Sequence, residues 1–148
     1  MPILKNTITL IDIVLIQAYN NWYDSLTEGS LNYFQDIYLN WINQPSPFCS
    51  GCSIIANFTG VPMNKVVIGF PASTSAGNTP PTPQVIDQFQ TWIGTSNFTI
   101  GGYFLWDSHW DSLNSYSLSN TILTASTNTP LTPNPPAPSP LCPPSLTT

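Results

Sequence analysis

Three short apolar runs, each followed by a stretch with helical spacing, constrain the fold of this chain more than any other feature of its sequence. The runs are Ile11–Ala18, Lys65–Phe70 and Gly101–Trp106. Their β-branched and aromatic residues do not alternate strictly with polar ones, which is typical of strands covered on both faces. Strands that alternate with helices favour a parallel sheet with right-handed crossovers. We therefore expect an α/β fold.

Stretches with helical spacing follow each of these runs. Ser30 is a candidate N-cap for a helix whose apolar residues share one face, at Leu31, Phe34, Tyr38, Trp41 and Ile42. Thr82 followed by Pro83 predicts the start of a second helix, which Gly94 is expected to end. Its apolar face consists of Val85, Ile86, Phe89, Trp92 and Ile93. A weaker pattern predicts a third helix over Leu113–Leu123.

The size of these strand–helix units indicates part of a larger domain. Three units over residues 10–124 have about 38 residues each, which suits a (β/α)8 TIM barrel of about 250 residues in length but supplies only three eighths of it. A three-stranded parallel sheet alone would leave two unpaired edges. We therefore expect a partial TIM barrel of about three βα units, and self-association through the exposed sheet edges if no further strands are present.

The composition changes near Ala125. Residues 125–148 hold half of the 16 prolines of the chain, together with Ser and Thr, and carry no charge. Such a segment buries too little apolar surface to offset the entropy of ordering it. We predict a folded portion over residues 1–124 and a Pro/Ser/Thr-rich linker or tail over residues 125–148.

The charge and hydropathy of the chain exclude two classes of partner. Two basic and seven acidic side chains give a net charge of -5, which offers no electrostatic footprint for nucleic acid. No apolar stretch reaches the roughly 18 residues that a membrane span needs. Met1–Leu10 also lacks the pattern of a signal peptide.

Three cysteines and two glycosylation motifs remain to be interpreted. Cys49 and Cys52 form a single Cys-x-x-Cys pair, and His109 is the one histidine. Because a zinc site needs further ligands, we interpret the pair as a local disulfide or as loop thiols, with no metal. Cys142 has no assigned partner. The sequons at Asn57 and Asn97 agree with an exported parent protein.

Aromatic and amide side chains follow the predicted strands. Tyr19 and Asn20 come after the first run, and Trp106 ends the third. Ligands of parallel sheets meet the carboxyl ends of the strands. This set suits a neutral, hydroxyl-rich ligand, because aromatic faces stack on sugar rings and amides bind hydroxyl or acetamido groups. The alternative is that Tyr19 and Trp106 only cap the core.

Three segments carry a family resemblance. Asp12–Asn21, Val66–Ser73 and Gly101–Asp107 resemble, in order, the sixth, seventh and eighth strands of family 18 glycoside hydrolases, most closely the class III chitinases of plants and fungi. The resemblance implies the carboxyl-terminal part of a barrel whose parent is an extracellular or cell-wall hydrolase of β-1,4-linked N-acetylglucosamine polymers such as chitin. It implies no cofactor. Cleavage in that family retains the anomeric configuration, and the acetamido group of the substrate is the nucleophile.

The resemblance also implies roles for four residues. Tyr19 matches a catalytic tyrosine that donates a hydrogen bond to the acetamido group and positions it. Gln17 matches a residue bordering the same pocket, and Trp106 matches the tryptophan that floors the cleavage subsite. Asn20 is expected to shape the rim of this substrate-binding site.

One essential group of the family is missing from this chain. The catalytic acid of the family ends an Asp-x-x-Asp-x-Asp-x-Glu motif, whereas Glu28 is the one glutamate here and Leu26 stands two positions before it. Asp107, His109 and Asp111 are expected to be exposed loop side chains and not surrogate acids. We therefore expect this chain alone to be inactive. The alternatives are a non-catalytic N-acetylglucosamine-binding lectin and a truncated gene product.

Overall fold

A three-stranded parallel sheet organises the molecule. The computed structural model describes residues 7–21, 26–48 and 59–127. The strands are β1 (Val14–Gln17), β2 (Val66–Pro71) and β3 (Gly102–Trp106), paired in the order β1-β2-β3. Both pairings are parallel, with Leu15 opposite Val67 and Val67 opposite Gly102. The prediction of a mixed α/β fold with a parallel sheet is confirmed.

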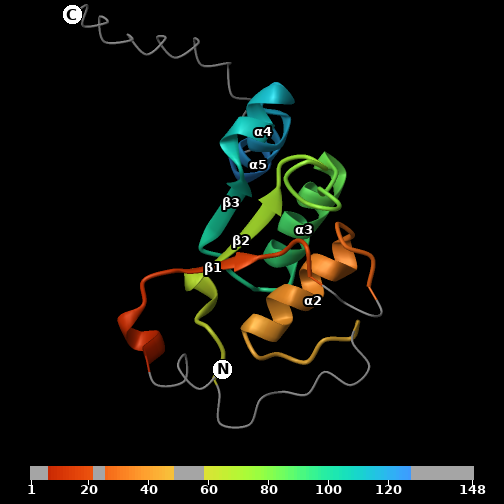
Figure 1. The fold of residues 1–148 in the computed structure, drawn as a ribbon. Helices are drawn as coiled ribbons and strands as arrows, with labels where there is room; N and C mark the ends of the chain where they lie inside the picture. Colours follow the sequence, from red (N-terminus) through yellow and green to blue (C-terminus); the bar gives the residue numbers. More distant parts are fainter. Residues whose placement is uncertain (1–6, 22–25, 49–58, 128–148) are drawn as a thin grey trace, which may run out of the picture.

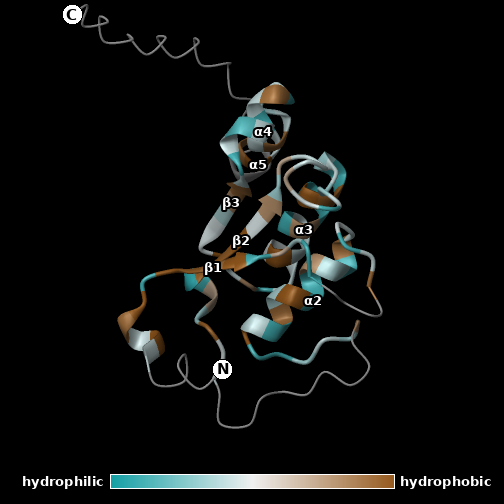
Figure 2. Ribbon diagram, in the orientation of Figure 1, coloured by the Kyte–Doolittle hydropathy of each residue, from teal (hydrophilic) through white to brown (hydrophobic). Residues whose placement is uncertain are grey.

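The connections between the strands are helical, as Figure 1 shows. The described helices and 3-10 turns are η1 (Ile8–Leu10), α2 (Leu31–Trp41), η2 (Met63–Lys65), α3 (Pro83–Thr95), α4 (Ser108–Leu113) and α5 (Ser117–Thr127). α2 and α3 pack on the same face of the sheet, and α5 packs beside α3. Hydrophobic colouring follows the strands in Figure 2. The molecule therefore has one helical layer against one sheet.

Aromatic rings join this helical layer to the sheet. Phe34 of α2 meets Phe70 of β2 edge to face at 5.0 Å between ring centroids, and Phe70 stacks on Tyr103 of β3 at 5.5 Å. Phe89 of α3 contacts both Phe34 and Tyr103. Such edge-to-face and stacked pairs add stability beyond the burial of their area. This cluster fixes α2 and α3 on the sheet.

The two predicted helix starts are confirmed. The Ser30 hydroxyl accepts a hydrogen bond from Tyr33 N at the start of α2, and the Thr82 hydroxyl accepts one from Val85 N at the start of α3. The predicted end of α3 is wrong by one residue, because the helix continues through Gly94 to Thr95. Gly94 lies on the exposed side, where nothing crowds the helix and no turn is required.

The predicted third helix, Leu113–Leu123, is wrong in its limits. The structure has α4 before Asn114 and α5 from Ser117 onward. Between the two helices the chain turns through Ser115 and Tyr116, both with φ of 56°. α5 ends at Thr127, and residues 128–148 of the predicted linker lie outside the described residues.

Buried carboxylates take structural roles. Asp111, expected to be an exposed loop side chain, is only 1% exposed. Its oxygens accept hydrogen bonds from Leu118 N at 3.1 Å and Ser119 N at 3.3 Å, and also from the Ser119 hydroxyl. Asp111 therefore accepts hydrogen bonds from N–H groups at the start of α5, which have no partner within the helix. Asp36 in α2 similarly accepts from Asn40 and Ser46.

The expectation that every strand is covered on both faces holds only for β2. All six residues of β2 are buried. Leu15 of β1, by contrast, is 57% exposed, and β3 is only partly buried. The physical reason is that the described helices cover one face. We call the other face, which carries Leu15, Gln17, Val67, Phe104 and Trp106, the open face.

The absence of a side chain at Gly69 allows Phe104 to lie across β2 on this open face. A Cβ atom at Gly69 would stand 2.1 Å from Cζ of Phe104. We expect Gly69→Ala to lower the free energy of unfolding by about 2 kcal/mol, because the methyl group forces the ring to move. Urea unfolding followed by circular dichroism measures this change.

Gly94→Ala is the matched control. No atom lies within 4 Å of a Cβ at Gly94, so alanine there should stabilise α3 by about 0.5–1 kcal/mol. Equal stability changes for the two variants would contradict the crowding at Gly69.

Buried tyrosines make the stability of the fold sensitive to alkaline pH. Burial raises the pKa of Tyr38 to about 12, and burial also raises the pKa of Tyr103. The folded chain therefore keeps phenolic protons that the unfolded chain loses above about pH 10. We expect the free energy of unfolding to fall as the pH rises from 10 towards 12.

Tyr38→Phe should show a smaller fall over the same pH range. The variant loses the hydrogen bond from the Tyr38 hydroxyl to Thr99 O, 2.6 Å long, so it starts from a lower stability at pH 8. Urea unfolding at several pH values gives both slopes. Parallel slopes for the two proteins would show that Tyr38 does not contribute.

Candidate functional site

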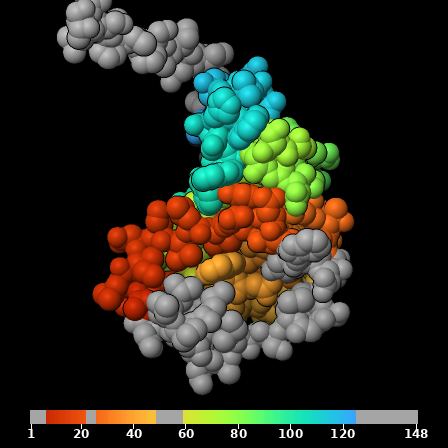
Figure 3. Space-filling model, viewed as in Figure 1, coloured from red at the N-terminus to blue at the C-terminus, as the bar shows by residue number. Residues whose placement is uncertain are grey.

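The carboxyl ends of the strands bring together residues that are distant in the sequence. Gln17 ends β1 and lies opposite Gly69, which lies opposite Phe104 of β3. Paired residues of neighbouring strands point to the same face, and so do residues two apart. Gln17 and Trp106 therefore both lie on the open face. In Figure 3 the surface of the β1 segment, in red, adjoins that of β3, in teal.

Trp106 presents its indole ring to solvent at the end of β3. Its side chain is 53% exposed, and its backbone oxygen accepts a hydrogen bond from Ala72 N at 2.9 Å. The peptide bond to Asp107 is cis. A half-exposed indole ring can stack on a flat ligand.

Tyr19 is buried beside the end of β2. It is 5% exposed, and its ring lies against Gly77, where a Cβ atom would be 3.2 Å from Cδ2 of Tyr19 and 2.7 Å from Cβ of Pro71. None of the described residues forms a hydrogen bond with its hydroxyl. Burial raises the pKa of this phenol above its usual value of 10. Tyr19 is therefore a neutral hydrogen-bond donor at physiological pH.

Side-chain amides hold the backbone around Tyr19. Gln17 Nε2 donates to Tyr19 O at 3.1 Å, and Asn21 Nδ2 donates to Gln17 O at 2.7 Å. These two bonds fold the chain back on itself directly after β1. They leave the carboxamide oxygen of Gln17 without a partner among the described residues.

Asn20 and Glu28 tie this turn to the loop after β2. Asn20 has a φ of 55°, a left-handed conformation that asparagine tolerates better than most residues. Its backbone N donates to Glu28 Oε1 at 2.9 Å, and its Oδ1 accepts from Asn78 N at 2.9 Å. We call Asn20, Glu28 and Asn78 the loop clamp. The clamp positions the backbone beside Tyr19.

Sequence reasoning missed Glu28 and Asn78 as contributors to this site. The sequence excludes Glu28 as the catalytic acid and indicates no other role for it, whereas in the structure Glu28 accepts the Asn20 N–H. No local pattern signals this contact, because the partners are eight and 58 positions apart in the sequence. The fold alone brings them together.

The carboxylates that follow Trp106 stabilise helix starts. Asp107 Oδ1 accepts from His109 N at 3.0 Å and from Trp110 N at 3.3 Å, so it caps α4. Asp111 is occupied at the start of α5. His109 is exposed, as expected, and its ring lies 5.1 Å from that of Trp110. Asp107 and Asp111 are therefore engaged with backbone N–H groups of this segment.

The other predicted features are only partly within the described residues. Cys49, Cys52, Asn57 and Cys142 lie outside them, whereas the sequon residue Asn97 is exposed. Within residues 7–21, 26–48 and 59–127, no three His, Cys, Asp or Glu side chains gather as metal ligands. In the same ranges, no helix is both long and apolar enough to cross a bilayer.

Comparison with known proteins identifies no family: no family model matches the chain, and no curated protein matches it.

The loop clamp predicts a specific effect of changing Glu28. We expect Glu28→Ala to speed amide hydrogen exchange at Asn20 by about tenfold, because a hydrogen bond to a charged acceptor is lost. Glu28→Gln keeps an oxygen acceptor and should restore most of the protection. Exchange is measured by NMR on the whole chain.

Asp12→Ala is the control, since Asp12 is exposed and precedes the same strand. Faster exchange at Asn20 in Asp12→Ala as well as in Glu28→Ala would mean that charge alone, and not the clamp, sets the protection.

Proposed function

We propose that the carboxyl ends of β1 and β3 bind an N-acetylglucosamine polymer, and that the chain is the carboxyl-terminal part of a chitinase-like family 18 barrel. The observation that carries this proposal is the arrangement of a half-exposed Trp106 and a buried Tyr19 at one edge of a parallel sheet, with no partner for the Tyr19 hydroxyl among the described residues. Both residues lie in segments that carry the family resemblance, Asp12–Asn21 and Gly101–Asp107.

The chemistry of each group supports a sugar ligand. The indole of Trp106 can stack on the apolar face of a pyranose ring. The Tyr19 hydroxyl can donate to the acetamido oxygen, and the Gln17 carboxamide oxygen can accept from a hydroxyl or from the acetamido N–H. A neutral polymer needs no charged partner, and the described carboxylates nearby are engaged with backbone groups.

The open face supports a larger barrel. In a complete (β/α)8 barrel the face away from the helices is filled by side chains from all eight strands. Here Ile13 and Leu15 remain exposed on that side of β1, as expected for residues that further strands would cover. Without such strands, we propose that the exposed sheet edges support self-association.

Hydrolysis in the parent enzyme would require an acid that this chain lacks. The acetamido oxygen attacks the anomeric carbon while an acid protonates the departing sugar oxygen. Glu28, the one glutamate, accepts a hydrogen bond from Asn20 N and supports the loop instead. The chain would then bind and orient the acetamido group, with the acid supplied by preceding strands of an extracellular or cell-wall protein.

A binding-only lectin is the second candidate function. The structural use of Glu28, Asp107 and Asp111 favours it, because none of these carboxylates is left to donate a proton to a ligand. Binding without turnover in the parent protein would distinguish the lectin from the enzyme.

Titration calorimetry with an N-acetylglucosamine tetramer tests the proposed site on the 148-residue chain. Trp106→Ala should weaken binding about tenfold through the loss of stacking. Tyr19→Phe should weaken it about fivefold, because one hydrogen bond is lost. We expect no release of reducing sugar by the chain.

Leu10→Ala is the control for Trp106→Ala. Leu10 is 82% exposed and precedes β1, at the opposite end of the sheet from the strand ends that form the site. The proposal fails if the tetramer does not bind or if Leu10→Ala weakens binding as much as Trp106→Ala. Hydrolysis that disappears on changing Tyr19 would overturn the expectation of inactivity.

A further inference from the structure

A hollow of about 590 Å³ lies between the loop after β2, the start of α3 and the turn between α4 and α5. Its volume is within the range of roughly 300–1,000 Å³ that is typical of small-molecule sites. Ala72 contributes to its lining, and Ala72 follows Pro71, whose strand partner is Trp106. Pro71 lies on the open face with its partner Trp106, and successive residues of a strand point to opposite faces. Ala72, and the hollow that it lines, are therefore on the helix side of the sheet edge.

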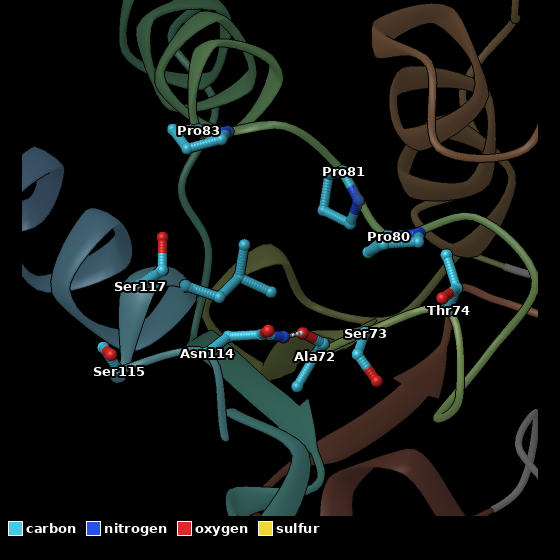
Figure 4. A pocket seen from close by; sticks show the side chains of 10 residues that line it. Ala72, Ser73, Thr74, Pro80, Pro81, Pro83, Asn114, Ser115 and Ser117 are labelled. Atoms are coloured by element: carbon cyan, nitrogen blue, oxygen red, sulfur yellow. Dashed lines mark hydrogen bonds between the residues drawn. The ribbon is translucent and has the colours of Figure 1, made fainter. Parts of the chain in front are cut away.

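Three prolines and one hydrogen bond restrict the walls of the hollow. Figure 4 shows Pro80, Pro81 and Pro83 along one side, facing Asn114 and Ala72 on the other. The ring of each proline fixes its φ angle. Asn114 Nδ2 donates to Ala72 O at 3.2 Å, which joins the α4–α5 turn to the end of β2. The hollow is thus formed before any ligand arrives.

Neutral hydrogen-bonding groups line this hollow. The polar side chains are Ser73, Thr74, Asn114, Ser115 and Ser117. The hydroxyls of Thr74, Ser115 and Ser117 have no hydrogen-bond partner among the described residues. The proline rings and Leu118 supply apolar surface beside them. A ligand that itself carries both hydroxyl groups and apolar surface would complement this lining.

An anionic ligand does not fit this lining. Among the described residues, no charged side chain contributes to it. The N–H groups of Leu118 and Ser119 at the start of α5 are already bound to Asp111. At the start of α3, Pro83 has no N–H, and the Val85 N–H is bound by Thr82. Lys65 lies before β2, at the opposite end of the sheet.

We propose that this hollow is a binding site for a neutral polyhydroxylated ligand, of the size of one or two sugar units. This inference goes beyond the proposed function and does not depend on it, because neither the Tyr19 nor the Trp106 side chain lines the hollow. Binding at the hollow can therefore be measured in a chain whose edge site has been removed.

NMR titration of the full chain carrying Trp106→Ala tests the site. The probes are N-acetylglucosamine and glucose, with inorganic phosphate as the charged comparison. Both sugars should cause saturable shifts at the amides of Thr74, Ser115 and Ser117, and phosphate should cause none. Thr74→Val and Ser117→Ala should each weaken sugar binding about fivefold through one lost hydrogen bond.

Two further variants make the result specific. Ser117→Phe fills the hollow from an exposed position at the start of α5 and should abolish the shifts. Thr91→Val changes an exposed threonine of α3 outside the hollow and should leave binding unchanged. Sugar shifts that Ser117→Phe does not alter, equal shifts from phosphate, or no saturable shift from either sugar would overturn the proposal.

Discussion

Complete burial of β2 is the constraint on which the rest of this structure depends. Its six residues carry no polar side chain, and all of them are buried. A strand in this position needs a partner on each edge, because its backbone N–H and C=O groups have no access to water. β1 and β3 provide these partners, and α2 and α3 cover one face. Gly69 then lets the ring of Phe104 cover β2 from the other face.

The same constraint creates the candidate site. Parallel pairing in the order β1-β2-β3 brings three carboxyl ends to one edge, where the chain must turn. Asn20 and Glu28 hold the turn after β1 through hydrogen bonds. Tyr19 lies in this turn with no hydrogen bond to its hydroxyl from a described residue, while Trp106 remains half exposed at the other outer strand.

The few charged side chains of this protein take part in holding the fold together. Of the described carboxylates, Asp36, Asp107 and Asp111 accept hydrogen bonds from side chains or helix starts near them. A helix start that is buried needs such an acceptor, since its first N–H groups have no partner within the helix. Because the few charges serve the fold in this way, the strand ends and the hollow beside them present mainly hydroxyls, amides and aromatic rings to a ligand.

The sequence by itself determined the elements and their order. The three apolar runs and the caps at Ser30 and Thr82 are local signals, and each depends on residues within a few positions of one another. The same locality explains why Tyr19, Asn20 and Trp106 could be named as candidate site residues from their places at strand ends, while Gln17 was added by the family resemblance.

Only the tertiary structure decided which groups are buried and which remain free. It places Asp111 under α5, engages Glu28 with Asn20, divides the third helix at Ser115 and leaves Leu15 exposed. The hydrogen bonds of Asp111 and Glu28 join residues seven or eight positions apart across turns, and Asn78 reaches Asn20 from 58 positions away. Helical or strand periodicity carries no information about either kind of contact. For that reason the residue types of the site were readable from the sequence, whereas the availability of their polar atoms was not.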